Sequence, residues 1–88
     1  MMTYKITLTG KVQNVGCRHT FSTIAKENNL TGYVKNLPSG AVELVLQSTA
    51  LVVDNLLTLA QRKNPKVEFS SCTVELITCH PLSSFEIL

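Results

Sequence analysis

The spacing of apolar residues constrains the fold of this chain more than any other feature of the sequence. Residues 4–9 and 41–47 alternate along the chain, with large apolar residues at the even positions. A period of two is typical of a strand that buries one face and exposes the other. These two segments therefore predict strands whose even-numbered side chains, such as Ile6 and Leu44, point into a core.

A helical period of 3.6 residues follows the first of these strands. Over about residues 18–28, the apolar residues Phe21, Ile24 and Ala25 fall on one side. Asn29 is suited to end the helix, because asparagine tolerates the left-handed conformation common at that position. This segment predicts a helix that buries one stripe.

A second helix is predicted over about residues 50–62. Ser48 or Thr49 can cap its start, and Asn64-Pro65 ends it. Its apolar stripe is wide and consists of Val52, Val53, Leu56, Leu57, Leu59 and Ala60.

The remaining strands complete the pattern. Residues 33–36 and 41–47 flank a turn at residues 37–40, which predicts a hairpin, and strands follow at about residues 69–79 and 85–88. The order is βαββαβ with a terminal strand. Because both helices must bury their stripes, the economical arrangement places them on one face of an antiparallel sheet. We therefore expect one α+β domain over residues 1–88, a ferredoxin-like βαββαβ sandwich with both helices on one face of an antiparallel sheet.

Length and charge exclude several classes of protein. A chain of 88 residues allows one compact domain. Its eight basic and six acidic side chains are scattered, whereas nucleic-acid binders carry a dense basic stripe. No apolar run reaches the ~18–20 residues of a membrane span, and the first residues do not resemble a secretory signal. We expect a cytoplasmic monomer with a small-molecule ligand, and neither nucleic acid nor membrane as a partner.

The cysteines do not predict a disulfide framework or a metal site. Their number is odd (Cys17, Cys72 and Cys79), and a cytoplasmic setting keeps thiols reduced. Zinc ligands at the usual C-x2-4-C spacing are absent from the sequence. Cys79 and His80, as neighbours on a strand, would point to opposite faces. We expect neither a metal nor a cofactor.

The segment from Gly10 to Gly16 has the properties of an anion-binding loop. It leads into the first helix, whose first amides have no partners within the helix and whose dipole favours negative charge. Arg18 nevertheless places a cation in the first turn, with no acidic residue before Glu27. A bound phosphate would neutralise both positive charges, and a guanidinium can contact it with two parallel hydrogen bonds. A solvent-facing arginine beside an ordinary loop is the alternative.

Asn36 is the second candidate residue. By strand parity it shares a face with Val34, on the helix side of the sheet. A carboxamide turned inward needs a partner, and one that both donates and accepts can hold a water molecule. A turn-stabilising asparagine before Leu37-Pro38 is the alternative interpretation.

Other catalytic arrangements fit the sequence less well. A thiol phosphatase binds phosphate in a C-x5-R loop. In this chain the arginine position of that pattern, six residues after Cys17, is Thr23. Cys17 is therefore interpreted as a packing residue, and His19 as a solvated residue of the first turn. No Ser/His/Asp set, paired carboxylates or Walker-type loop is apparent.

Two stretches of the sequence resemble a known family, the acylphosphatases. The first is similar to the family pattern G-x-V-Q-G-V-x-[FY]-R, and the second to G-x-V-x-N-x-x-[DS]-G. In this chain they read Gly10-Lys11-Val12-Gln13-Asn14-Val15-Gly16-Cys17-Arg18 and Gly32-Tyr33-Val34-Lys35-Asn36-Leu37-Pro38-Ser39-Gly40. The spacing between the stretches fits as well, and Ser84-Phe85-Glu86-Ile87 is similar to the usual C-terminal ending.

The resemblance implies a reaction and a set of residues. The reaction is hydrolysis of a carboxylic–phosphoric mixed anhydride to carboxylate and inorganic phosphate, without metal or covalent intermediate. The family's catalytic arginine and asparagine correspond to Arg18 and Asn36. Its phosphate-holding loop amides correspond to the substrate-binding segment Gln13, Asn14, Val15, Gly16, Cys17 and Arg18. Because acyl phosphates are already activated, positioning and charge stabilisation can supply most of the acceleration.

Two departures from the family pattern lie inside the loop. Asn14 replaces a glycine, although asparagine is the least costly substitute at positive φ. Cys17 replaces an aromatic residue, which removes buried surface worth ~1–2 kcal/mol. Neither changes Arg18 or Asn36, so we expect an active enzyme.

Two non-enzymatic alternatives remain open from the sequence. One is a phosphoanion-binding ferredoxin-like module that has lost turnover through the changes at Asn14 and Cys17. The other is an RNA-binding domain, which would need exposed aromatic residues on the central strands. Tyr33 alone points outward by parity, so the RNA-binding alternative is the weaker.

Overall fold

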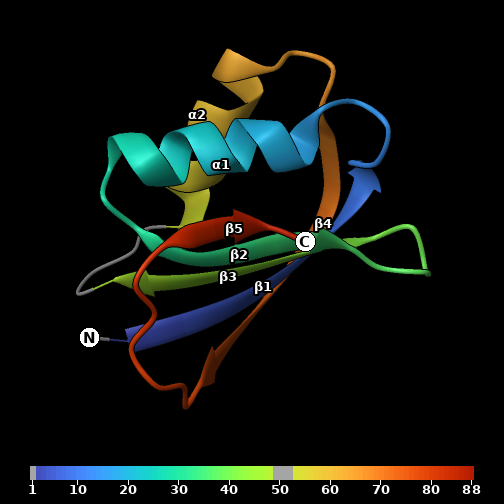
Figure 1. The fold of residues 1–88 in the computed structure, drawn as a ribbon. Coiled ribbons are helices and arrows are strands. Elements are labelled where there is room, and N and C mark those ends of the chain that lie inside the picture. Colours follow the sequence, from blue (N-terminus) through green and yellow to red (C-terminus); the bar gives the residue numbers. More distant parts are fainter. Residues whose placement is uncertain (1, 49–52) are drawn as a thin grey trace.

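The computed structural model describes residues 2–48 and 53–88 (Figure 1). The elements in this part of the chain are β1 (Met2–Lys11), α1 (Cys17–Glu27), β2 (Thr31–Asn36), β3 (Val42–Ser48), α2 (Val53–Lys63), β4 (Glu68–Ile77) and β5 (Phe85–Ile87). The strands form one sheet in the order β4-β1-β3-β2-β5, and both helices lie on the same face of it. The ferredoxin-like α+β fold expected from the sequence is confirmed.

The element boundaries agree closely with the apolar pattern. Helix α1 starts and ends one residue before the expected limits, and Asn29 adopts the left-handed conformation with φ 55. Helix α2 ends at Lys63, directly before Asn64 and Pro65. The expected start of α2 at about residue 50, with Thr49 as one of two candidate caps and Val52 in its stripe, lies outside the described residues. The other candidate cap, Ser48, is the last residue of β3.

The sheet is mixed, which corrects the expectation of an antiparallel sheet throughout. Strands β1 to β4 pair antiparallel with one another. Strand β5 pairs parallel to β2, with Val34 opposite Ile87. The reason is topological, because β4 and β5 lie on opposite edges of the sheet and the chain must cross between them before β5 begins (Figure 1).

The core lies between the sheet and the helices. Alternate residues of the central strands, including Ile6, Leu8 and Leu44, are fully buried. Phe21 and Ile24 of α1 pack against them, as the helical period predicts. Burial of such side chains contributes roughly 1.5–3 kcal/mol each. This packing fixes α1 over the sheet and so sets where its N-terminus lies.

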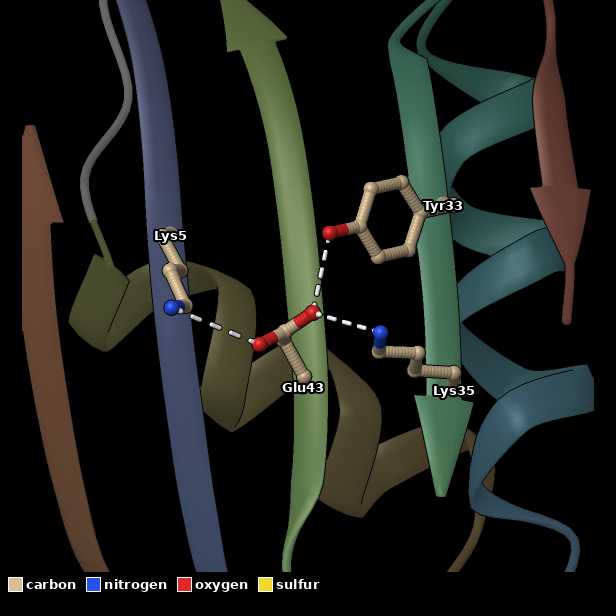
Figure 2. Close-up of polar contacts among 4 residues, drawn as sticks. All are labelled: Lys5, Tyr33, Lys35 and Glu43. Atoms are coloured by element: carbon tan, nitrogen blue, oxygen red, sulfur yellow. Dashed lines mark hydrogen bonds and ion pairs between the residues drawn. The ribbon is translucent and has the colours of Figure 1, made fainter. Parts of the chain in front are cut away.

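The opposite face of the sheet holds a buried charge that the alternation did not predict. Glu43 points away from the helices, yet only 7% of it is exposed. Its carboxylate accepts a hydrogen bond from the Tyr33 hydroxyl at 2.9 Å and pairs with Lys5 at 3.6 Å and Lys35 at 3.5 Å (Figure 2). Burial raises the pKa of Glu43, but the hydrogen bond from Tyr33 and the two lysines outweigh it and lower the pKa overall. The network thus links β1, β3 and β2 across this face.

Gln47 is a second buried polar residue on this face. Its amide nitrogen donates to the His80 carbonyl at 2.8 Å, and its amide oxygen accepts from the Leu82 backbone N–H at 2.7 Å. These residues belong to the segment that joins β4 to β5. Gln47 therefore fastens the crossing segment to the sheet and helps to determine where β5 arrives.

Candidate active site

The loop between β1 and α1 turns sharply at two left-handed residues. Asn14 has φ 62 and Gly16 has φ 81. Asparagine and glycine tolerate this conformation best, so Asn14 replaces the expected loop glycine at small cost. Gly16 is the N-cap of α1 and offers no side-chain cap to the first amides of the helix. These amides are therefore available to an anion.

A pocket of about 230 Å³ opens at this helix terminus. Several elements contribute to its wall: the loop, the first turn of α1, the end of β2 and the end of β5. The lining residues are Val12, Asn14, Gly16, Cys17, Arg18, His19, Asn36 and Ile87. The structure thus brings Arg18 and Asn36 to one pocket, together with three other residues of the predicted binding segment. Gln13 and Val15 do not line the pocket.

Arg18 is the second residue of α1 and is half-buried at the pocket. The first turn of this helix contains no acidic residue, so no carboxylate there competes for the guanidinium. Its Nη1 atom donates to the Leu88 carbonyl oxygen at 2.9 Å. One Nη1–H is therefore held by the residue that follows β5, and other N–H donors of the fork remain for a ligand.

Asn36 is the last residue of β2 and lies on the same face as Val34, as parity predicts. Among the residues that the structure describes, its Oδ1 is the buried side-chain polar atom that lacks a hydrogen-bond partner. A buried polar group without a partner costs about 1–3 kcal/mol. Such a group at a pocket wall indicates that a ligand or water molecule completes it.

The side chain of Gln13 has a role that the sequence did not indicate. It points toward the β2–β3 turn, where Nε2 donates to the carbonyl oxygens of Leu37 and Ala41 at 2.9 Å each. Leu37 directly follows Asn36. Gln13 thus links the loop that leads to Arg18 with the turn that follows Asn36.

Asn64 holds the loop from another side. Its Nδ2 atom donates to the Val15 carbonyl oxygen at 2.7 Å and to the Thr20 hydroxyl at 3.1 Å. The sequence pattern around Asn64 indicates only that a helix ends there. No local pattern signals this contact, because it joins residues 49 positions apart.

Cys17 and His19 take the places expected for non-catalytic residues. Cys17 is buried, and burial raises the pKa of its thiol to about 11. At neutral pH the thiol is therefore protonated and a poor nucleophile. His19 is exposed at the pocket rim.

Within residues 2–48 and 53–88, no group of three or more histidine, cysteine, aspartate or glutamate side chains is placed to hold a metal ion. No helix in these ranges is long and apolar enough to cross a membrane.

The fold and the pocket together define a class of protein: a small α+β domain in which an arginine of a first helical turn and a strand-end carboxamide line one pocket of about 230 Å³. The family model for acylphosphatases matches residues 4–87. The chain therefore belongs to the acylphosphatase family, as the two sequence motifs implied.

Individual relatives agree with this assignment. The chain is 45% identical over 71 residues to the acylphosphatase of Shewanella oneidensis, covering 81% of this chain and 72% of that protein. It is 31% identical over 87 residues to the acylphosphatase of Archaeoglobus fulgidus, covering 99% and 98%. The crystal structure of acylphosphatase from Bacillus subtilis superposes with a TM-score of 0.87 at 25% identity, covering 100% of this chain and 99% of that one. The chain is thus an acid-anhydride hydrolase for acyl phosphates, and a non-catalytic module is not favoured.

Proposed function

We propose that backbone amides of the 13–18 segment, at its pocket-lining residues Asn14, Gly16, Cys17 and Arg18, hold the phosphoryl group of an acyl phosphate together with the Arg18 guanidinium, while Asn36 orients the attacking water. The observation that carries this proposal is the juxtaposition at one pocket of Arg18 and the unpartnered carboxamide oxygen of Asn36. The positive charge of the Arg18 guanidinium complements the negative phosphoryl oxygens. The carboxamide oxygen of Asn36 can accept a hydrogen bond from the attacking water.

The loop supplies the preorganised part of the site. Left-handed residues at Asn14 and Gly16 turn successive peptide units, an arrangement that forms anion-binding concavities. The helix dipole adds positive potential at the same point. Donors that are fixed before the substrate arrives need no reorganisation during the reaction.

The reaction follows from these placements. The oxygen of the water attacks phosphorus in line with the bond to the acyl oxygen. A P–O bond forms to the water oxygen as the P–O bond to the carboxylate breaks, and the attacking water releases one of its two protons to solvent, which leaves carboxylate and hydrogen phosphate. The carboxylate is a good leaving group, so no strong general base is needed. Charge on the equatorial oxygens is stabilised by Arg18 and the amides.

An isotope experiment tests this chemistry. Turnover of benzoyl phosphate in H2 18O is expected to place one labelled oxygen in the inorganic phosphate and none in the benzoate. Label in benzoate would show attack at the acyl carbon and contradict the role proposed for Asn36. Mass spectrometry of both products measures the two outcomes.

We propose that the enzyme acts as a monomer, since a single chain supplies both Arg18 and Asn36 to the same pocket. We further propose a cytoplasmic location, because Cys72 is a free and exposed thiol. Size-exclusion chromatography at micromolar concentration, and fractionation of cells, test these two statements.

A further inference from the structure

Asn64 lies between α2 and β4. It reaches two adjacent peptide units of the loop between β1 and α1, one directly and one through Thr20. It donates directly to the Val15 carbonyl oxygen. It also donates to the Thr20 hydroxyl, which in turn donates to the Gly16 carbonyl oxygen at 3.0 Å. The Asn64 Oδ1 atom accepts from the Lys66 backbone N–H at 3.2 Å, which keeps the Nδ2 end directed at the loop.

These contacts determine where two backbone amides point. In a planar trans peptide unit, the C=O and the N–H point in opposite directions. With the Val15 carbonyl held by Asn64, the Gly16 N–H points away from Asn64. With the Gly16 carbonyl held by Thr20, the Cys17 N–H points out of the helix terminus. Gly16 and Cys17 both line the pocket, whereas Asn64 and Thr20 are not among its lining residues.

We propose that Asn64 is a positioning residue for phosphate, which acts through Val15 and Thr20 to aim the Gly16 and Cys17 amides into the pocket. This inference rests on the proposed function, in which those amides bind the phosphoryl group. A loop with two left-handed residues has several accessible peptide orientations. Fixing the orientation in advance lowers the entropic cost of binding an anion.

Inorganic phosphate, as product and competitive inhibitor, is the probe. In Asn64→Ala, its inhibition constant against benzoyl phosphate is expected to rise about tenfold, the equivalent of one weakened hydrogen bond to a charged group. The matched control is Asn28→Ala. Asn28 also donates from its side chain to a backbone carbonyl, that of Ile24 at 2.8 Å, but at the far end of α1. In Asn28→Ala, the inhibition constant of phosphate is expected to equal that of the wild type.

A second variant and a spectroscopic readout separate positioning from stability. Thr20→Val preserves size but removes the hydroxyl between Asn64 and Gly16, and it should also weaken phosphate binding. In 15N-labelled wild-type protein, phosphate should shift the Gly16 and Cys17 amide resonances, and this response should shrink in both variants. Equal inhibition constants and equal shifts in wild type and variants would overturn this inference alone. A wild-type protein that neither binds phosphate nor hydrolyses benzoyl phosphate would overturn the proposed function as well.

Discussion

The guanidinium of Arg18 donates through Nη1 to the carbonyl oxygen of Leu88, 70 residues further along the chain. Strand β5 lies beside β2, so this contact ties the first turn of α1 to the edge of the sheet next to Asn36. The arginine is therefore oriented before substrate binds.

Replacing Arg18 by alanine should impair both turnover and phosphate binding. The guanidinium contributes charge and direction in the ground state and in the transition state, so kcat/KM should fall by ~10²-fold or more and inhibition by phosphate should weaken in parallel. Arg18→Lys should recover part of this loss, because an ammonium supplies charge without the planar fork. Steady-state kinetics with benzoyl phosphate measures both. Undiminished phosphate inhibition in Arg18→Ala would remove Arg18 from the binding site.

Replacing Asn36 by alanine should separate activity from stability. We expect kcat to fall by ~10²-fold or more, with phosphate inhibition nearly unchanged, because the carboxamide acts on the water. The free energy of unfolding should stay the same or rise by up to about 1 kcal/mol, because the variant removes a buried oxygen that has no partner. Urea denaturation provides the second measurement. Near-normal turnover, or a clear loss of stability, would contradict this account.

Gln13→Glu tests the link between the loop and the β2–β3 turn. The substitution keeps the shape but replaces two donors by a carboxylate that faces the carbonyl oxygens of Leu37 and Ala41. We expect kcat to fall by about tenfold through displacement of Asn36. A double-mutant cycle provides the control, since Gln13→Glu should have little further effect on kcat in the Asn36→Ala background. Additive effects on kcat would show that Gln13 does not act through Asn36.

The buried network around Glu43 should make stability depend on pH. Its folded-state pKa lies below the ordinary value of 4.5, so its contribution is present above pH 4.5 and is lost as pH falls through the folded pKa. Burial raises the pKa of Tyr33 to about 12, with a further contribution from its bond to Glu43, so stability should also decline from pH 10 upward. In Glu43→Gln, the free energy of unfolding should fall less between pH 7 and pH 3 than it does in the wild type. Urea midpoints between pH 3 and 7 measure it, and a difference from wild type that persists undiminished at pH 3 would contradict the assignment.

Cys17→Ala should retain turnover within about threefold, since the thiol is protonated and buried. In the folded protein, iodoacetamide should label the exposed Cys72 but leave Cys17 unmodified. Mass spectrometry of the labelled protein identifies the sites. Inactivation that parallels modification of Cys17 would revive a thiol mechanism.

The fold was predictable because its signals are local. Alternation placed Ile6 and Leu44 inside, and the 3.6-residue period placed Phe21 and Ile24 against them. The burial of Gln47 was not predictable from the same alternation. It depends on where the segment after β4 crosses the sheet, and this route is set by contacts between residues more than 30 positions apart.

The candidate site likewise contains residues that the sequence indicates and residues that only the structure identifies. Arg18 and Asn36 could be selected because each conflicts with its local setting: one is a cation at the positive end of a helix, the other an amide on an apolar face. Asn64 and the side chain of Gln13 create no such local conflict. Their partners become apparent only once the loop, the turn and the α2–β4 junction are assembled, so the supporting contacts required the structure. The catalytic assignment of Arg18 and Asn36 stays a prediction until the variants above are measured.

Strand β5 has only three residues, lies at the edge of the sheet and precedes the carbonyl that orients Arg18. Short edge strands open locally at a smaller free-energy cost than the core. When this edge frays, the guanidinium is released although the rest of the molecule stays folded. Inactivation on gentle heating should therefore precede global melting, and amide hydrogen exchange at residues 85–88 should report the opening that governs it.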